Sequence, residues 1–345
     1  MLKATHWRSR MGEEVRAAPD AVARQQAELA PAIAELVACL RRRPPEVVVT
    51  CARGSSAHAA TFGKHLIERH LGFPVAAAAP SIASVYARRL RLRKQLFLTI
   101  SQSGRSDDLI AMARSAKRAG ALTVAIANAT GSPLARACDI ILPMGAGREL
   151  SVAATKSFIT AASALMRFIA AWHGATGFDA ALGRLPRRLA AAAELDWGDA
   201  ADMIATAPSL AVIGRGPTLA IAREAALKLK ETCTVAAEAF SGAEFLHGPV
   251  ALVSPRHPVL MLMPGDAAKR GMGLLASRLR RTRSRLLVAG PDRGRDQLPV
   301  LAADHPDADA VCLIQSVYAL TLRLATILGI DVDHPRLLRK VTRTR

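Results

Sequence analysis

The feature that most limits the possible folds is an alternation of short apolar runs with segments of helical periodicity. In the first half of the chain, the apolar runs cover residues 47–50, 96–100, 122–128 and 140–144. Helical spacing of apolar residues lies between them, as at 57–70, and a long helix is expected over 153–172. Short continuous apolar runs are typical of strands buried on both faces. The pattern therefore predicts an α/β fold with a parallel sheet covered by helices.

The second half of the chain repeats this plan. The run 210–216 ends in Arg215-Gly216, as the first run is followed by Arg53-Gly54, and Gly216 stands 162 residues after Gly54. At the same offset, the runs 259–263 and 285–289 match two strands of the first half. A closing helix recurs at about 309–328, at a slightly shorter spacing. Three strands aligned at one offset would rarely arise by chance, so we infer a duplicated unit.

The expected domain limits follow from this repeat and from the chain length, which favours two domains. An amphipathic helix over 20–42, closed by Pro44-Pro45, is too short to form a domain or a helix-turn-helix DNA-binding module. We expect an N-terminal helical segment (1–45), a first domain (46–177), a helical connector (178–199), a second domain (200–330) and a C-terminal tail (331–345).

Composition limits the classes of partner. The formal net charge is +19, but aromatic residues are only 4%, so platforms for stacking bases are scarce. We interpret the charge as a solvated basic surface that attracts anionic substrates, and expect no nucleic-acid partner. The N-terminus has no apolar signal-like region and no stretch predicts a membrane span.

Cysteine usage indicates a reducing compartment. The five cysteines are odd in number and widely spaced, with no C-x-x-C pair, so neither a disulfide framework nor a zinc site is indicated. We expect a cytoplasmic protein that needs no metal and no cofactor. The cysteines are Cys39, Cys51, Cys138, Cys233 and Cys312.

A serine-rich turn follows the second of these strands. The turn Ser101-Gln102-Ser103-Gly104-Arg105-Ser106 precedes a helix-like segment that begins at Asp107. Backbone N–H groups at a helix start carry partial positive charge, and serine hydroxyls add donors, which together suit a phosphate. Gly104 would allow the backbone to turn and to approach a ligand closely. From this stretch alone, a serine-capped helix without a ligand remains an equal alternative.

The second half lacks this turn and has charged residues instead. Glu224, Lys228 and Glu231 are spaced to lie on one helix face, where they form either a functional cluster or an ordinary exposed salt-bridged face. Further on, His247-Gly248-Pro249 follows Glu238 and Glu244. A single histidine is more often structural, but it can titrate near neutral pH.

Taken together, these residues resemble the family of double sugar-isomerase (SIS) domains, in particular the isomerase half of glucosamine-6-phosphate synthase. The resemblance implies two tandem SIS domains, each a parallel sheet flanked by helices in a Rossmann-like, flavodoxin-like sandwich. It runs from about residue 46 to the C-terminus. The stretches that carry it are Gly54-Ser55-Ser56, Ser101 to Gly104, Val152 to Lys156, Glu224 to Glu231, Glu244 to Pro249 and Asp331 to Arg336.

The resemblance also implies roles for individual residues. Glu231 matches the base that moves a proton between C1 and C2 of the sugar, and His247 the residue that assists ring opening from the partner subunit of a homodimer. Lys340 matches the lysine that forms a Schiff base with the ketose. Glu224 and Lys228 match further polar members of the catalytic helix. The phosphate and sugar positions are matched by Ser56, Ser101, Gln102, Ser103, Ser106 and Val152, with Gly54 and Ser55 beside them.

The departures from the synthase refine the expected function. Only a short segment precedes the first domain and it offers no terminal cysteine nucleophile, so we expect no glutamine-derived ammonia. Arg105-Ser106 replaces Glu-Thr and Ala154 replaces Ser, as in stand-alone deaminases of the family, while Arg339 replaces a small residue before Lys340.

The expected reaction is the conversion of glucosamine 6-phosphate to fructose 6-phosphate and ammonia. Three alternatives stay open. If the same site catalysed the reverse reaction, the protein would be an ammonia-dependent synthase. Another phosphosugar, such as galactosamine 6-phosphate, could be the substrate. A phosphosugar-binding regulator would belong to a different class, supported only by the charge of +19.

Overall fold

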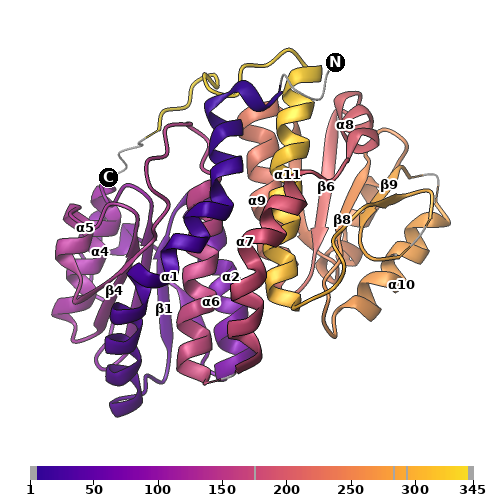
Figure 1. Ribbon diagram of the computed structural model, residues 1–345. Helices are drawn as coiled ribbons and strands as arrows, with labels where there is room; N and C mark the ends of the chain where they lie inside the picture. Colours follow the sequence, from indigo (N-terminus) through magenta and orange to yellow (C-terminus); the bar gives the residue numbers. More distant parts are fainter. Residues whose placement is uncertain (1–5, 175, 283, 293, 341–345) are drawn as a thin grey trace. The chain divides into compact units, whose positions relative to one another are not determined.

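The computed structural model describes residues 6–174, 176–282, 284–292 and 294–340, and these form two compact units (Figure 1). The first unit comprises Asp20–Glu149, Lys156–Gly183 and the tail from Arg339. The second comprises the chain up to Pro19, Leu150–Thr155 and Arg184–Leu338. Helices α1 (Arg10–Arg42) and α7 (Thr176–Ala193) each contribute residues to both units. The domain limits expected from the sequence stay a prediction.

A five-stranded sheet forms the centre of the first unit, with every pair of neighbouring strands parallel and the order β2-β1-β3-β4-β5. All six residues of β3 are buried, because helices cover both faces of the sheet. The predicted α/β fold is therefore confirmed. The strands are β1 (Val48–Ala52), β2 (Val75–Ala77), β3 (Leu96–Ser101), β4 (Leu122–Ala127) and β5 (Ile140–Pro143).

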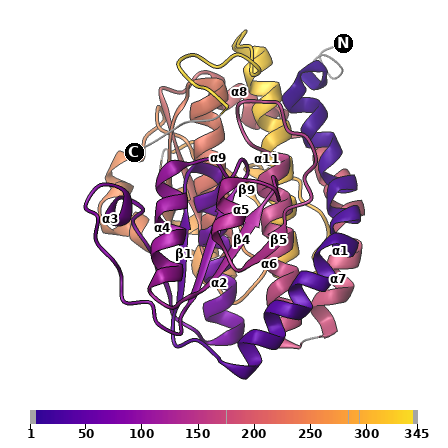
Figure 2. The same cartoon turned by 90° about the vertical axis from the view of Figure 1, so that its left-hand side faces the viewer.

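Side chains of successive strand residues lie on opposite faces of this sheet. Val49 and Phe97 lie in one core with Leu109 and Met112 of α4. Helices α2 and α6 pack together against the other face (Figures 1 and 2). Their close approach depends on Gly63, where a Cβ would come within 2.9 Å of a methyl carbon of Leu165. The helices are α2 (Gly54–Leu71), α3 (Ser81–Ser84), α4 (Asp107–Arg118), α5 (Pro133–Ala137) and α6 (Lys156–His173).

The second unit has the same topology, with parallel strands in the order β10-β9-β8-β6-β7. Its strands β6, β7, β8, β9 and β10 correspond to β1, β2, β3, β4 and β5 of the first sheet. Adding the offset of 162 residues to Val124–Ala127 of β4 gives the residues of β9, so the predicted duplication is confirmed. The strands are β6 (Ser209–Gly214), β7 (Ala236–Ser241), β8 (Val259–Leu262), β9 (Leu286–Ala289) and β10 (Gln297–Leu298). The helices are α8 (Gly198–Ala205), α9 (Pro217–Cys233), α10 (Lys269–Arg280) and α11 (Pro306–Ile327), with 3-10 turns η2 (His6–Arg8), η3 (Glu244–His247) and η4 (Pro249–Leu252).

Several boundaries differ from the sequence expectation. Helix α2 begins at Gly54, not near residue 57, because three small residues form its first turn and Ala57 N–H already donates to the carbonyl of Arg53. Helix α6 begins at Lys156, not near residue 153. The helical connector is confirmed, but as two helices, α7 and α8. Strands β2, β7 and β10 were not predicted.

Among the described helices, α11 alone is long and apolar enough to cross a membrane. Its most apolar window is 83% buried inside the protein, against partners that include α9 and α8 of the same unit. Because α11 is mostly buried, its length and apolar composition are weak evidence that it spans a membrane.

Candidate functional site

The strand order reverses at β1 in the first unit, because β2 lies on one side of β1 and β3 on the other. Ligands of open α/β sheets bind at such a point, outside the carboxyl ends of the strands. The segments that leave these ends are Arg53 to Ser56 after β1 and Gln102 to Ser106 after β3. The predicted phosphate-binding residues of both segments therefore meet at the switch point of the sheet.

An ion pair joins the two segments. Arg53 Nε lies 2.7 Å from Asp108 Oδ2, and the Arg53 Nη2 group contacts the same oxygen. Asp108 is fully buried in the first turn of α4, where its Oδ1 also accepts the N–H of Leu109 at 2.8 Å. This pair fixes the start of α4 relative to the start of α2, so the N–H groups of both helix starts are held at the carboxyl ends of β1 and β3.

The serine turn has a defined internal geometry. Ser101 Oγ is buried and accepts the N–H of Gly104 at 3.1 Å. Ser103 Oγ is half-buried and accepts the N–H of Arg105 at 3.4 Å, a long bond. Ser106 occupies the N-cap position of α4, but its side chain makes no capping bond. The capping bond expected of a serine-capped helix is therefore absent at Ser106, and phosphate binding by this turn stays a prediction.

Gly104 is required by the fold of this turn for two reasons. Its φ angle is +60°, a left-handed conformation that favours glycine. A Cβ at this position would also lie 2.0 Å from Ser132 Oγ, the group that caps α5 by accepting the N–H of Ala135. Because the turn lies this close to α5, no other residue fits here without displacing the backbone.

The corresponding point of the second unit is occupied by a buried threonine. Thr218, in the first turn of α9, is almost fully buried, and its Oγ1 lies 2.9 Å from the carbonyl of Leu262 while accepting the N–H of Arg215 at 3.0 Å. The segment after β8 has no serine. The two halves have thus diverged, and only the first has kept the serine turn.

Helix α9 carries a polar cluster inside the second unit. Lys228 is fully buried, with Nζ 3.6 Å from Glu224 Oε1 and in direct contact with Glu231 Oε2. Glu224 is also buried and accepts the hydroxyl of Tyr318 at 3.3 Å. The alternative of an exposed salt-bridged face is therefore wrong. The side chain of Glu231 is 24% exposed, so one end of this buried chain of charges reaches the surface of the unit.

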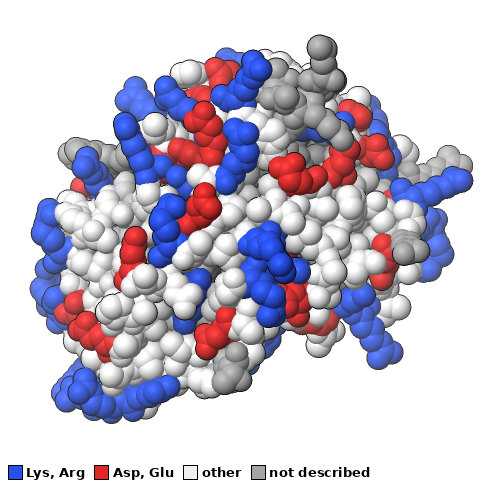
Figure 3. Space-filling model, viewed as in Figure 1, with Lys and Arg blue, Asp and Glu red and all other residues white. Residues whose placement is uncertain are grey.

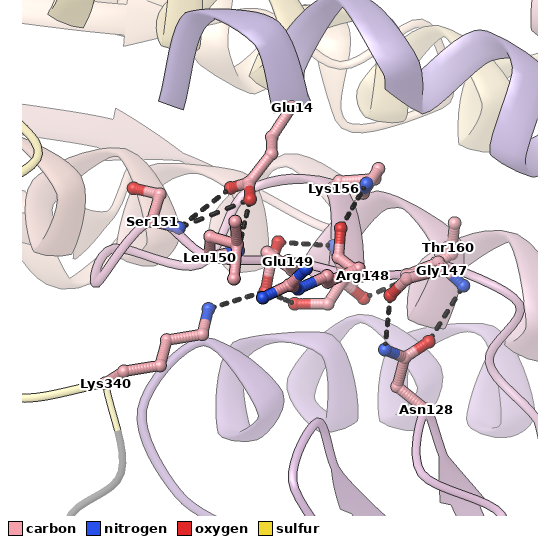
Figure 4. Close-up of polar contacts among 12 residues, drawn as sticks. Glu14, Asn128, Gly147, Arg148, Glu149, Leu150, Ser151, Lys156, Thr160 and Lys340 are labelled. Atoms are coloured by element: carbon pink, nitrogen blue, oxygen red, sulfur yellow. Dashed lines mark hydrogen bonds and ion pairs between the residues drawn. The ribbon is translucent and has the colours of Figure 1, made fainter. Parts of the chain in front are cut away.

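His247 and Val152 lie elsewhere in the second unit. His247 ends η3 and is exposed, and the described part of the chain offers its ring no hydrogen bond. Val152 is half-buried in the segment Leu150–Thr155, whose backbone is held by Glu14. The carboxylate of Glu14 accepts the N–H groups of Leu150 and Ser151, the latter at 3.2 Å (Figure 4).

Lys340 of the tail meets a carboxylate that the sequence reasoning missed. Its Nζ lies 3.0 Å from Glu149 Oε2 in the first unit (Figure 4). The Glu149 side chain is fully buried and also accepts the N–H and hydroxyl of Ser157, at 3.0 and 2.7 Å. Burial by itself would raise the pKa of Glu149, but the charge of Lys340 and the Ser157 donors outweigh it and hold that pKa below its usual range. The signal in the sequence was an acid three residues before Val152.

No described residues form a group of three or more His, Cys, Asp or Glu side chains able to hold a metal ion. On the face shown in Figure 3, Lys and Arg side chains are scattered and interspersed with Asp and Glu. That arrangement is typical of a solvated basic surface.

Comparisons with known proteins identify the family. The profile of the SIS domain matches residues 44–171 and 203–282. Glutamine–fructose-6-phosphate aminotransferase (isomerizing) of Symbiobacterium thermophilum is 34% identical over 85% of this chain and 51% of its own length. The chain thus spans about half the length of the curated relatives it matches.

Solved structures extend the comparison. A candidate phosphosugar isomerase from Silicibacter pomeroyi is 43% identical, with a TM-score of 0.90 over 94% of this chain and 100% of that one. The C-terminal domain of glucosamine-fructose-6-phosphate aminotransferase from Francisella tularensis is 25% identical, with a TM-score of 0.85 over 95% of this chain and 98% of that one. With the SIS profile matched once in each half and one parallel sheet in each unit, this chain belongs to the SIS-domain family and carries two such domains in tandem.

Proposed function

We propose that the protein is a phosphosugar isomerase that acts on hexose phosphates. Relatives named for aminotransferase and phosphosugar isomerase activities support this, as does the serine turn at the switch point of the first sheet. Phosphate binding far from the reacting carbons would provide positioning energy for the chemistry.

The finer proposal is the deamination of glucosamine 6-phosphate. His247 assists opening of the sugar ring, which exposes an aldehyde at C1. Glu231 removes the proton from C2 and returns it to C1, through an enolamine, to give a ketimine at C2. Water then attacks C2 and displaces ammonia directly, or the amine of Lys340 displaces ammonia to form an imine that water hydrolyses; either route releases fructose 6-phosphate. The serine turn holds the phosphate throughout.

The observation that carries this proposal is the partial exposure of Glu231 together with its contact with a buried lysine. Its carboxylate is partly exposed, while the fully buried Lys228 contacts one oxygen and connects it to Glu224. A carboxylate held at a fixed orientation, with access to a ligand, suits a proton shuttle between two neighbouring carbons. An ordinary surface ion pair would not bury its lysine completely.

We also propose a cytoplasmic homodimer in which His247 acts in the site of the partner subunit. Support comes from the exposure of His247 beside the exposed apolar residues Leu246 and Leu252. Light scattering of the purified protein should give the mass of a dimer, and a monomer at micromolar concentration would contradict this part of the proposal.

The test is an assay of ammonia release over a panel of sugars. Glucosamine 6-phosphate should be deaminated, whereas glucosamine without phosphate should react far more slowly because the serine turn has no phosphate to hold. Galactosamine 6-phosphate tests whether the enzyme distinguishes the two hexosamine epimers. Fructose 6-phosphate with either ammonium or glutamine tests the synthetic direction. Binding of phosphosugars without turnover of any would overturn the enzyme proposal and favour a regulator.

A further inference from the structure

The ion pair between Lys340 and Glu149 joins a partly exposed amine to a buried carboxylate. The side chain of Lys340 is 24% exposed, whereas the carboxylate it contacts is fully buried. Glu149 Oε2 receives both the amine of Lys340 and the hydroxyl of Ser157, and Oε1 receives the N–H of Ser157. The carboxylate therefore has one fixed orientation, with its outer oxygen on the lysine nitrogen (Figure 4).

The segment before Glu149 is itself held in place. Asn128 donates to the carbonyl of Gly147 at 2.8 Å and accepts the N–H of Ala146 at 2.9 Å. The buried amine of Lys156 donates to the carbonyl of Arg148 at 2.9 Å. These bonds fix the backbone that leads into Glu149, which is the kind of support that a proton-transfer group requires.

From this geometry we propose that Glu149 accepts the proton of the Lys340 ammonium when that amine forms a Schiff base with a ketose phosphate. This inference rests on the Schiff-base role of Lys340 in the proposed function, and it adds a residue to which no role has been given. Glu149 acts on the reacting nitrogen, at 3.0 Å, and not on the sugar carbons.

The proposed step balances without an oxidant or reductant. A proton passes from Lys340 Nζ to Glu149 Oε2, and the freed electron pair of the nitrogen forms a bond to C2 of the open-chain ketose. The former carbonyl oxygen of C2 takes up two protons, one returned by Glu149 and one lost by the lysine nitrogen after it has bonded to C2, and leaves as water. The products are a protonated imine on Lys340, water and the regenerated carboxylate.

The burial of Glu149 favours this transfer over the same step in water. The buried carboxylate of this ion pair has lost the solvation of its charge, whereas the neutral acid would lose little by burial. The charge of Lys340 is the main influence that keeps the pKa of the buried carboxyl low. As the lysine loses its proton, that influence disappears and the carboxylate becomes a better proton acceptor.

A purely structural ion pair predicts the opposite result on mutation. If Glu149 only anchored Lys340, it would stabilise the ammonium and slow any reaction of the amine with a carbonyl. Glu149→Gln would then make Lys340 more reactive. If Glu149 accepts the proton, the same substitution makes Lys340 less reactive, so the sign of the change separates the two roles.

The experiment measures imine formation at Lys340 in the full-length protein at pH 7. Two carbonyl probes are used with cyanoborohydride as trap: fructose 6-phosphate, and formaldehyde, which needs no sugar site. Modification of Lys340 is measured by peptide mass spectrometry relative to the exposed Lys230. Glu35→Gln, an exposed residue on α1, is the matched control and should leave the ratio unchanged.

We expect Glu149→Gln to lower the Lys340 ratio at least about tenfold with both probes, as for loss of a general base. An unchanged or higher ratio with formaldehyde overturns the inference. A Glu149-dependent reaction with formaldehyde but none with fructose 6-phosphate would support the inference and contradict the Schiff-base step of the proposed function. If Glu149→Gln does not fold, Glu149→Asp replaces it in the experiment. The shorter side chain moves the proton acceptor away from Lys340, so the Lys340 ratio should fall if Glu149 accepts the proton. The ratio should rise if Glu149 only anchors the lysine.

Discussion

Arg53, after β1, and Asp108, in the first turn of α4 after β3, are joined by a bond of 2.7 Å between Nε and Oδ2, in which the aspartate side chain is fully buried and the arginine side chain is 49% exposed. This asymmetry predicts unequal costs of mutation. Arg53→Ala leaves a buried charge without its guanidinium and should lower the free energy of unfolding by about 3–5 kcal/mol. Asp108→Asn leaves an arginine that water already reaches, and should cost about 1–3 kcal/mol. Urea denaturation of both variants checks the order; equal costs would contradict it.

Gly104→Ala should be far more destabilising than Gly54→Ala. Both glycines have positive φ, +60° and +52°, so both variants bear the strain of a left-handed alanine, about 1–2 kcal/mol. Only at Gly104 would the new methyl overlap Ser132, since a Cβ on Gly54 meets nothing within 4 Å. Thermal melting of the two variants isolates the steric part. Combining Gly104→Ala with Ser132→Gly, which removes the clashing atoms, should recover part of the loss; no recovery would mean that the strain lies elsewhere.

Ser103→Ala should weaken the binding of sugar phosphates. Among the described residues, Ser103 Oγ has one hydrogen bond, the long one within the turn, so its hydroxyl is available to a phosphate. Loss of one charge-assisted hydrogen bond should cost about 1.5–3 kcal/mol of binding free energy. Calorimetric titration with fructose 6-phosphate measures the change, and inorganic phosphate serves as a second ligand that reports on the turn alone. Unchanged affinity for both would remove the turn from the site.

The features predicted from sequence are those whose signal is local. Strand β3 is a continuous apolar run, and the serine turn and Gly104 follow it directly, so their place in the fold could be read from the order of residues. Strands β2 and β7 are rich in alanine, which has little preference for strands, and they exist because β1 and β6 pair with them. Sequence spacing showed that Glu224 and Lys228 share a face, but not that they are buried, because burial depends on distant residues such as Tyr318. Glu149 was missed for the same reason, since its partner Lys340 lies 191 residues away.

Lys228→Met should unfold the second unit more readily than the matched change Lys230→Met on the same helix. Lys228 is fully buried between two carboxylates, and removing one partner of a buried pair typically costs about 3–5 kcal/mol. Lys230 is exposed, so its replacement should change stability by less than about 0.5 kcal/mol. Guanidinium denaturation followed by the fluorescence of Trp197 in this unit measures both. A similar small effect of the two variants would mean that the buried charges are solvated in the native protein.

Glu231→Gln should separate catalysis from binding. Glutamine keeps the shape of the side chain and can still accept a hydrogen bond from Lys228, but it cannot take a proton from C2 of the sugar. Removal of a general base typically lowers turnover by about 10²–10⁴-fold. The affinity for fructose 6-phosphate should change little, because the serines proposed to hold the phosphate belong to the first unit.

Two measurements on this one variant decide the role of Glu231. Turnover of glucosamine 6-phosphate reports on the whole reaction, and entry of solvent deuterium at C1 or C2 reports on proton transfer alone. Both should fall together, while Glu238→Gln, an exposed acid on β7 of the same unit, should leave both near the wild-type value. If turnover falls but deuterium still enters, Glu231 serves a later step such as the release of ammonia. If both persist, another group is the base, and Glu231 only completes the buried ion-pair cluster with Lys228 and Glu224.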